Sequence, residues 1–563
     1  MTTHARPLAT RLAALSDAQL EHLLRERGVR ADVAWEDFFD AAEALLETAS
    51  VERALGTLTR DEARALREAV QQGRTAELET LSALGLVDAE GRVPAPVSAV
   101  VSTRPDIASV SEDAPAPASA AASARAAERA FTTIGAIADL LLAARTAPLA
   151  LVGTGALSAG ERKRLAEGGA DAASADDLRL LAETAGLVRA VDRELRVTPA
   201  AEDWLAASFS LRWAQVVAAF RTGMPRGIRS GAGWTAPSSW PDAHPWNPTW
   251  PARAEELLRA AHLLGLSADG SEPEWSAGLR RGDPVDTSSL DALLPGEVDR
   301  LFLQNDLTAI APGPLQPALD NRLRAMTEHE TAAQASSYRF TADAIALALV
   351  EGETAESIMA FLGEVSLTGV PQPLAYLVSQ TATRHGLVRV HGEPSGGTRV
   401  SSSDAHLLEA IEVDRGLRPL GLVRDGDALV SRVNAETVAW ALADARYPAT
   451  LIGRDGQPVP ASRRRVAEAV EPEDHVYDAL IARLRAQQGP DADAAWLDRE
   501  LDAAVRARAL VSVEVGMPDG SSRELVLEAT GLGGGRLRGR DRAADVERTL
   551  PVRSIRSVRV LEE

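Results

Sequence analysis

The stretch Thr383-Arg384-His385-Gly386-Leu387-Val388-Arg389-Val390 marks the place where a helix is expected to end and a strand to begin. Glycine ends a helix readily because it adopts the left-handed conformation just after the last helical residue. The β-prone run from Arg389 to Val400 contains turn residues and therefore predicts a hairpin. A helix followed by a hairpin is how a winged helix ends.

An expected helix ends in the phrase Gly-Leu-Val twice more, before the β-prone runs Asp88–Val93 and Arg189–Val197. These three helix-ending copies begin at Gly85, Gly186 and Gly386, and their unequal separations indicate separate modules rather than a solenoid repeat. Winged helices bind nucleic acid or proteins and rarely catalyse reactions. We therefore expect several winged-helix modules in one chain.

The composition excludes several classes of protein. The chain has 563 residues, 45% of them hydrophobic, which is enough for roughly three to five domains. It has no cysteine, so disulfides, thiolate metal sites and a cysteine nucleophile are excluded. No apolar run of about 18 residues exists, and Met1–Leu15 lacks the apolar core of a signal peptide. We expect a cytoplasmic protein without membrane contact.

None of the possible catalytic or cofactor-binding motifs has the required residues at the required spacing. The only lysine, Lys163, lies between two arginines, so the chain has no Walker loop for phosphates. A zinc-binding HExxH helix starting at His329 would need histidine at Ala333. A dinucleotide loop starting at Gly153 would need glycine at Ser158. We expect no catalysis and no cofactor.

Several motifs between residues 301 and 400 resemble a known family. They are Leu301–Leu315 (LFLQNDLTAIAPGPL), Tyr338–Thr341 (YRFT), Val370–Val378 (VPQPLAYLV) and Arg384-His385-Gly386. Together they resemble the domain at the N-terminus of XPB-type helicases, and in particular the actinobacterial helicase-associated proteins that carry it without a motor. The resemblance covers roughly residues 1–465 and is strong at 130–220 and 295–455. The resemblance implies a role beside DNA, next to a motor on another chain.

Pattern and composition together predict an α+β protein that is mainly helical, with several winged-helix modules. With the resemblance supplying the XPB N-terminal-like domain, the expected order is an N-terminal helical or winged-helix module (1–105), an Ala/Pro/Ser linker (106–128), a second winged-helix region with a Trp/Pro-rich segment (129–290), an XPB N-terminal-like domain (291–465) and a helix with a small SH3-like barrel (466–563).

Four tryptophans in the second region are interleaved with prolines: Trp234, Trp240, Trp246 and Trp250. They are candidate partner-binding residues, as a stacking platform for bases or a proline-rich ligand for a protein. The alternative is that they pack an irregular crossing onto helices beneath it. No arginine lies among them, which favours packing.

The helix before the third Gly-Leu-Val is the copy most compatible with nucleic acid. A helix-turn-helix reads DNA with its second helix, and the corresponding helix of the second unit begins with Ala175-Asp176-Asp177, which would repel phosphates. The third helix, Pro371–Arg384, carries no acidic residue. Candidate nucleic-acid-binding residues here are Gln372, Ser379, Gln380, Thr383, Arg384, Arg389 and Arg399. An uncharged partner-binding surface fits equally well.

Arginines are concentrated near the C-terminus, although the formal net charge of −21 opposes nonspecific DNA binding by the whole chain. Between Arg536 and Arg559, eight arginines stand against three acidic residues, and Arg463-Arg464-Arg465 adds a second basic spot. β-prone runs around a Pro518-Asp519-Gly520 turn predict a small barrel. It resembles the WYL domains of bacterial transcription regulators but lacks the Trp-Tyr-Leu run. The resemblance implies a nucleotide or nucleic-acid ligand, with Arg536, Arg538, Arg540, Arg553, Arg556 and Arg559 as candidates.

We therefore expect a DNA-associated accessory protein in repair or transcription, without catalysis of its own. A helicase or nuclease would be supplied by another chain. The alternative is a protein-interaction scaffold whose winged-helix modules hold partners without contacting DNA.

Overall fold

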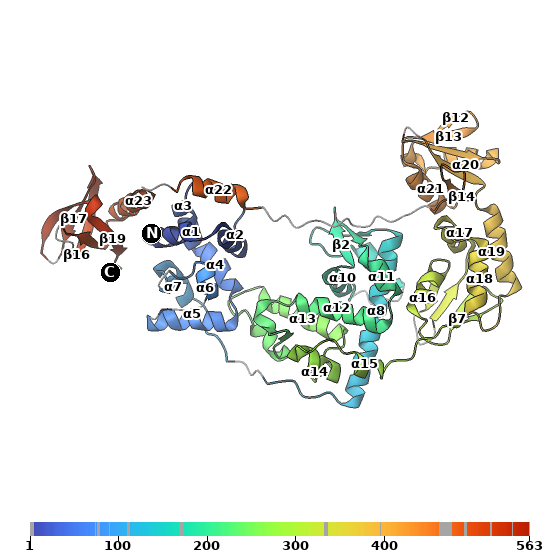
Figure 1. The fold of residues 1–563 in the computed structure, drawn as a ribbon, viewed down its shortest axis with the longest axis horizontal. Coiled ribbons are helices and arrows are strands. Elements are labelled where there is room, and N and C mark those ends of the chain that lie inside the picture. Colours follow the sequence, from blue (N-terminus) through green and yellow to red (C-terminus); the bar gives the residue numbers. More distant parts are fainter. Residues whose placement is uncertain are drawn as a thin grey trace.

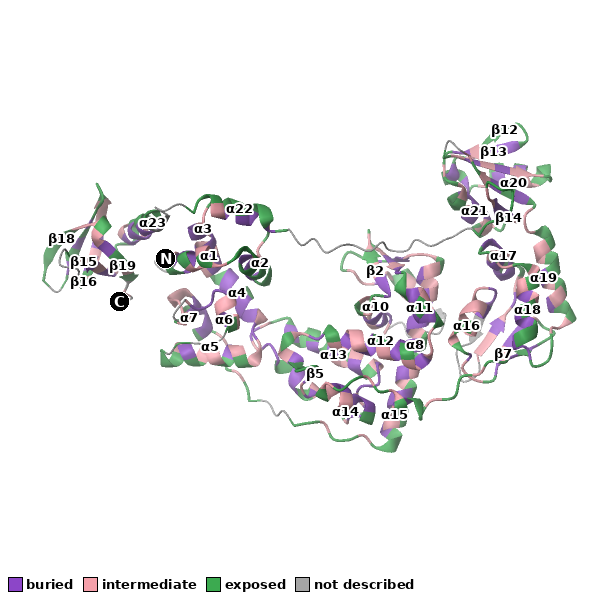
Figure 2. Ribbon diagram, in the orientation of Figure 1, coloured by how far each residue is buried: buried purple, intermediate pink, exposed green. Residues whose placement is uncertain are grey.

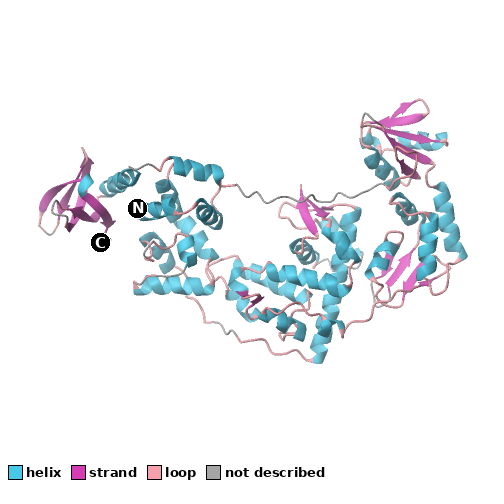
Figure 3. Ribbon diagram, in the orientation of Figure 1, coloured by secondary structure: helices cyan, strands magenta, loops and turns pink. Residues whose placement is uncertain are grey.

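The computed structural model describes residues 5–561 apart from 74, 76–78, 89–90, 110–112, 168–173, 332–335, 394–395, 461–475, 489–491, 518–520 and 543. The fold is mixed α+β and mainly helical, as predicted (Figure 3). Figure 1 shows the chain starting next to its own C-terminal part, crossing a large helical centre and reaching the opposite end of the molecule near β12–β14.

The N-terminal region is helical: α1 (Ala5–Ala14), α2 (Asp17–Glu26), α3 (Phe38–Leu46), α4 (Thr48–Thr57), α5 (Arg60–Gln72), α6 (Glu79–Ala83) and α7 (Ala95–Ser102). Gly85 follows α6 with φ +66°, the left-handed conformation that was predicted. No strand follows it among the described residues of Asp88–Val93. The Asp88 N–H donates to the Arg92 carbonyl oxygen.

The central region packs around α8 (Ala120–Thr146), which contacts α10 (Ala175–Thr184), α12 (Phe209–Thr222) and α13 (Trp250–Leu263). This helix begins inside the predicted linker. Its small side chains allow close packing: a Cβ on Gly265 would stand 2.5 Å from the Ala126 carbonyl oxygen. The other elements here are β1 (Leu149–Ala150), α9 (Ala159–Glu167), β2 (Val188–Val191), β3 (Glu194–Val197), α11 (Ala200–Ala206), η1 (Arg226–Ile228), β4 (Arg229–Ser230), β5 (Gly233–Trp234), η2 (Pro237–Asp242), α14 (Glu274–Arg281) and α15 (Ser288–Asp291).

The second Gly-Leu-Val forms the hairpin that the sequence predicts. Gly186 has φ +71°, and β2 and β3 follow it as an antiparallel pair. β1 adds a third strand, which gives the order β1-β3-β2.

The region from 301 to 460 contains two cores. The first packs a sheet of order β6-β7-β9-β8 against helices, and the second surrounds a sheet of order β12-β13-β11-β10-β14. Its elements are β6 (Phe302–Leu303), β7 (Thr308–Ala311), α16 (Pro317–Arg324), β8 (Glu328–Thr331), β9 (Ser336–Arg339), α17 (Ala342–Val350), α18 (Ala355–Val365), α19 (Gln372–Arg384), β10 (Val388–Gly392), β11 (Thr398–Ser402), α20 (Ala405–Val413), η3 (Arg418–Leu420), β12 (Val423–Asp425), β13 (Ala428–Ser431), α21 (Ala435–Asp444) and β14 (Ala449–Ile452).

The hairpin after the third Gly-Leu-Val is not a free wing. Gly386 has φ +83°, and β10 pairs with β11 as predicted. However, β11 also pairs with β13, and β10 pairs in parallel with β14. The winged-helix prediction is therefore correct for the local hairpin and wrong for its surroundings, because both strands lie inside a five-stranded sheet.

The C-terminal region forms an open sheet rather than the predicted closed barrel. Its antiparallel order is β18-β17-β16-β15-β19, with α23 packed on one side. β18 was missed by the sequence prediction, because its residues carry charges that hide the strand pattern. The elements are α22 (Asp478–Ala486), α23 (Ala492–Ala507), β15 (Leu510–Gly516), β16 (Ser522–Gly533), β17 (Arg536–Asp541), β18 (Val546–Pro551), η4 (Val552–Ser554) and β19 (Ile555–Val560).

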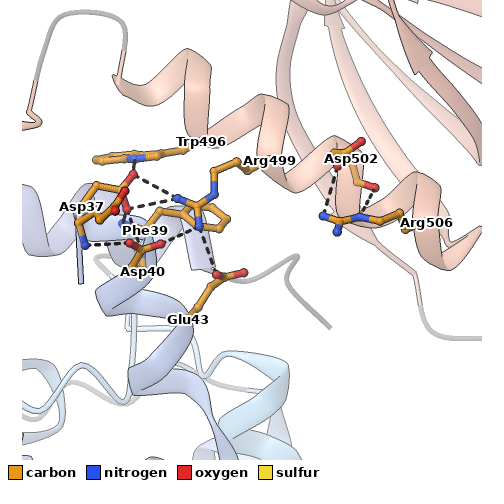
Figure 4. A network of polar contacts seen from close by, with 9 residues as sticks. Asp37, Phe39, Asp40, Glu43, Trp496, Arg499, Asp502 and Arg506 are labelled. Atoms are coloured by element: carbon orange, nitrogen blue, oxygen red, sulfur yellow. Dashed lines mark hydrogen bonds and ion pairs between the residues drawn. The ribbon is translucent and has the colours of Figure 1, made fainter. Parts of the chain in front are cut away.

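The two ends of the chain share one hydrophobic core. Tyr477, Leu484 and Trp496 are buried among the side chains of α1–α3. Figure 4 shows the polar part of this contact, where the Arg499 guanidinium reaches three carboxylates of the N-terminal region. Its distances are 3.2 Å to Asp37, 2.8 Å to Asp40 and 3.4 Å to Glu43. This contact, which we call the terminal latch, holds the helix that carries the C-terminal sheet.

Candidate functional site

Helix α19 has one side in a core and one side on the surface (Figure 2). Pro371 occupies the N-cap, and Leu374 and Val378 are buried against α17 and α18. The exposed side carries uncharged hydrogen-bonding residues and one aromatic: Gln372, Tyr376, Ser379, Gln380 and Thr383. We call this set the α19 stripe. Its members recur at helical spacing, so they lie along one side of the helix.

Tyr376 is the aromatic member of the stripe, with 66% of its surface accessible. Sequence reasoning did not select it. The available signal was spacing, because Tyr376 lies four residues from both Gln372 and Gln380. An exposed tyrosine in an uncharged stripe has the character of a protein-contact residue.

Two further apolar side chains are exposed just before α19. Leu301 and Ser366 form a parallel bridge, which brings β6 next to the turn that leads into the helix. The residues that follow them, Phe302 and Leu367, are 40% and 52% exposed. The beginning of α19 is therefore next to an apolar surface, which the sequence did not reveal because the two residues are distant along the chain.

The basic residues predicted for the third module are partly neutralised. Arg399 donates to Glu393 at 3.1 Å and to Asp425 at 2.8 Å. Arg389 is exposed on β10, and Arg384 lies in the last turn of α19, where a cation complements the helix dipole. Of the seven candidate residues of this region, four are uncharged, and Arg399 is the one arginine among them for which ion pairs are described.

The arginines of the C-terminal sheet do not form one basic surface. Three of them are held in ion pairs within the sheet, namely Arg540 with Asp545, Arg542 with Glu528 and Arg548 with Asp541. Arg556 lies near Glu514, whose pKa is lowered by hydrogen bonds from Ser522 and Ser557 and then by this guanidinium. The others, Arg536, Arg538, Arg553 and Arg559, are exposed.

The strand register explains why the sequence count of charge is misleading. Arginines on β17 alternate with Leu537 and Gly539, which are buried, so the arginines lie on the outer side of the sheet. The register places on that side Arg536, Arg538, Arg540 and Arg559, together with Glu514, Glu524, Glu528 and Glu547. Four arginines and four glutamates leave no net charge on these residues.

All four tryptophans of the Trp/Pro-rich segment are buried. The exposed fraction is 4% or less at each of Trp234, Trp240, Trp246 and Trp250. Trp240 donates its indole N–H to the Thr235 carbonyl oxygen, and Trp250 donates to the Trp240 carbonyl oxygen. No indole is left on the surface for a partner or a base, so these residues pack the chain on itself.

Among the described residues, no group of three or more histidines and carboxylates is arranged so that it could hold a metal ion. Within the same part of the chain, no helix is long and apolar enough to cross a membrane. Arg463-Arg464-Arg465 and the predicted turn at Pro518-Asp519-Gly520 lie outside the described residues.

The chain is thus an α+β protein with several hydrophobic cores. Comparison with known proteins adds one assignment: residues 301–425 match the family model for the helicase conserved C-terminal domain. The match runs from β6 to β12 and includes α19. The chain therefore carries a helicase-associated domain at this position. A search of curated proteins found no match to the chain.

Proposed function

We propose that this chain is a non-catalytic accessory protein that works beside DNA, in repair or transcription, with a helicase or nuclease supplied by another chain. The observation that carries the proposal is the helicase-associated domain at 301–425, which occurs in a chain without a Walker loop. A helicase-type domain without a phosphate-binding loop needs its motor from elsewhere.

The α19 stripe is the surface that meets the protein partner in this proposal. Exposed aromatic and apolar side chains with few charges are typical of the centre of a protein interface. Tyr376, Phe302 and Leu367 supply such groups around an uncharged helix. The likeness of this region to the N-terminal domain of XPB-type helicases suggests a helicase as the partner.

Two measurements on the purified chain test the proposal. It should hydrolyse no ATP, with or without DNA, and it should bind short single-stranded or duplex DNA with an affinity that falls as salt rises. Detectable ATP hydrolysis that copurifies with the chain through successive columns would contradict the accessory role.

A protein-interaction scaffold without DNA contact is the second candidate. It is favoured by the ion pairs of Arg399 and by the net charge of −21, both of which weaken attraction for phosphates. Absence of any DNA binding at low salt would support the scaffold and exclude the first proposal.

A further inference from the structure

Arg536, Arg538 and Arg540 of strand β17 differ in the residues that pair with them on the neighbouring strands. Arg540 on β17 lies between Glu528 and Glu547 of the neighbouring strands. Arg538, two residues earlier, lies between Gly531 and Thr549. The strand therefore changes from a charge-balanced part to a part with no opposing carboxylate.

Arg536 continues this uncovered part. Its cross-strand neighbours are Gly533 and Pro551, which carry no charge. The β16–β17 hairpin turns at Gly534 and Gly535, which have φ of +58° and +70°. A Cβ added to either glycine would meet no atom within 4 Å, so the backbone at the tip is bare and open.

A third arginine reaches the same end of the sheet from η4. The Val552 N–H donates to the Gly535 carbonyl oxygen at 2.9 Å, which places Arg553 next to the hairpin tip. Among the described residues, the side chains of Arg536, Arg538 and Arg553 have neither an ion pair nor a hydrogen bond. We call these three residues the hairpin patch.

We infer that the hairpin patch binds the phosphate backbone of DNA, an inference that rests on the proposed function. A guanidinium presents a planar fork of N–H donors that matches phosphate oxygens. The bare glycines allow a backbone to approach without steric conflict. In a chain with net charge −21, cations that are left unpaired at a protruding tip are the groups best placed to attract a polyanion.

The opposite side of the hairpin limits the direction of approach. Asp498, Arg499 and Asp502 of α23 line a hollow of about 350 Å³ together with Leu532, Gly533 and Gly535. Because α23 packs against β16 on this inner side, DNA contacts the outer side and the tip. With three arginines, the contact is small and strongly salt-dependent.

The test compares two double variants of the full chain that remove the same charge from the same sheet. Arg536→Gln with Arg538→Gln removes two uncovered arginines, whereas Arg540→Gln with Arg542→Gln removes two that are held in ion pairs. Binding of a fluorescent duplex is followed by anisotropy over a salt series. Circular dichroism and thermal unfolding confirm that both variants keep the fold.

We expect the first variant to reduce the slope of log affinity against log salt by about two, since each lost phosphate contact reduces it by about one. The control should keep most of the wild-type slope. If the wild-type chain binds DNA and both variants bind equally well, the hairpin patch is excluded while the proposed function stands. If the wild-type chain does not bind at low salt, both fail.

Discussion

The α19 stripe and the hairpin patch lie at opposite ends of the molecule (Figure 1) and present different chemistry. The stripe is uncharged and includes Tyr376, and Arg399 on the hairpin that follows α19 is already held in ion pairs. The patch is cationic and has no carboxylate across from it. The sequence analysis gave both regions as candidate nucleic-acid-binding sites. The ion pairs seen in the structure distinguish the one from the other. The difference teaches that a basic surface consists of the arginines that remain after intramolecular pairing.

The largest effect is expected inside α19. Leu374→Ala removes a fully buried side chain and should destabilise the 301–402 region by about 2 to 5 kcal/mol. Tyr376→Ala removes a mostly exposed side chain and should change stability by less than about 0.5 kcal/mol. Hydrogen–deuterium exchange of peptides from α17–α19 measures both. A comparable loss of protection in both variants would show that the stripe is structural.

The next effect concerns binding at the stripe. Tyr376→Ala should weaken binding of the helicase partner by about thirtyfold, corresponding to about 2 kcal/mol for an interface anchor. The same variant should leave the salt dependence of DNA binding unchanged. A smaller slope of log DNA affinity against log salt in Tyr376→Ala would contradict the proposed difference between the two regions, because it would mean that DNA contacts α19.

The next prediction concerns the terminal latch. We expect it to support the C-terminal sheet, which carries the hairpin patch, but not the α19 stripe. Arg499→Ala leaves three carboxylates without their cation and should destabilise packing of α23 on α3 by about 1 to 2 kcal/mol. Exchange should rise in α1–α3 and α23 and stay unchanged in α19. Arg506→Ala, which breaks an exposed i,i+4 pair with Asp502, is the matched control. Equal effects of the two variants would contradict the latch.

The smallest effect is a pH dependence of the same latch. Burial raises the pKa of Glu43, and neighbouring Asp40 and Asp37 add to the rise against the opposing effect of Arg499. A raised folded-state pKa stabilises the protein below the unfolded pKa of about 4.3, and that contribution is lost as pH rises through the folded pKa.

Glu43→Gln should therefore stabilise the chain slightly at neutral pH, by less than about 1 kcal/mol because the site is partly exposed. The gain should disappear near pH 4. Thermal unfolding at the two pH values measures it. A gain that is larger at low pH would contradict the assigned direction.

Sequence alone could predict what depends on neighbours along the chain. Gly186 and Gly386 end helices and start hairpins as expected, because a left-handed glycine is a local event. The pairing of β10 with β14 was invisible, since Val388 and Ala449 meet only in the folded sheet. The pairing of Arg399 with Asp425 was hidden for the same reason.

The candidate sites show the same limit. The absence of acidic residues on α19 could be read directly from the sequence. Counting eight arginines between Arg536 and Arg559 overstated the positive charge of the C-terminal sheet, because its surface also carries glutamates from β15 and β16. Burial of Trp234, Trp240 and Trp250 depends on contacts across the central core, and burial of Trp246 depends on the N-terminal core, which no local pattern fixes.

Site-specific photocrosslinking in the native cell tests the central claim most directly. A photoreactive residue is placed at Tyr376 in one strain and at Arg536 in another. Our account predicts that position 376 captures a helicase-class ATPase in a product resistant to nuclease, and that position 536 captures DNA in a product that nuclease removes. DNA at position 376 together with none at position 536 would contradict it.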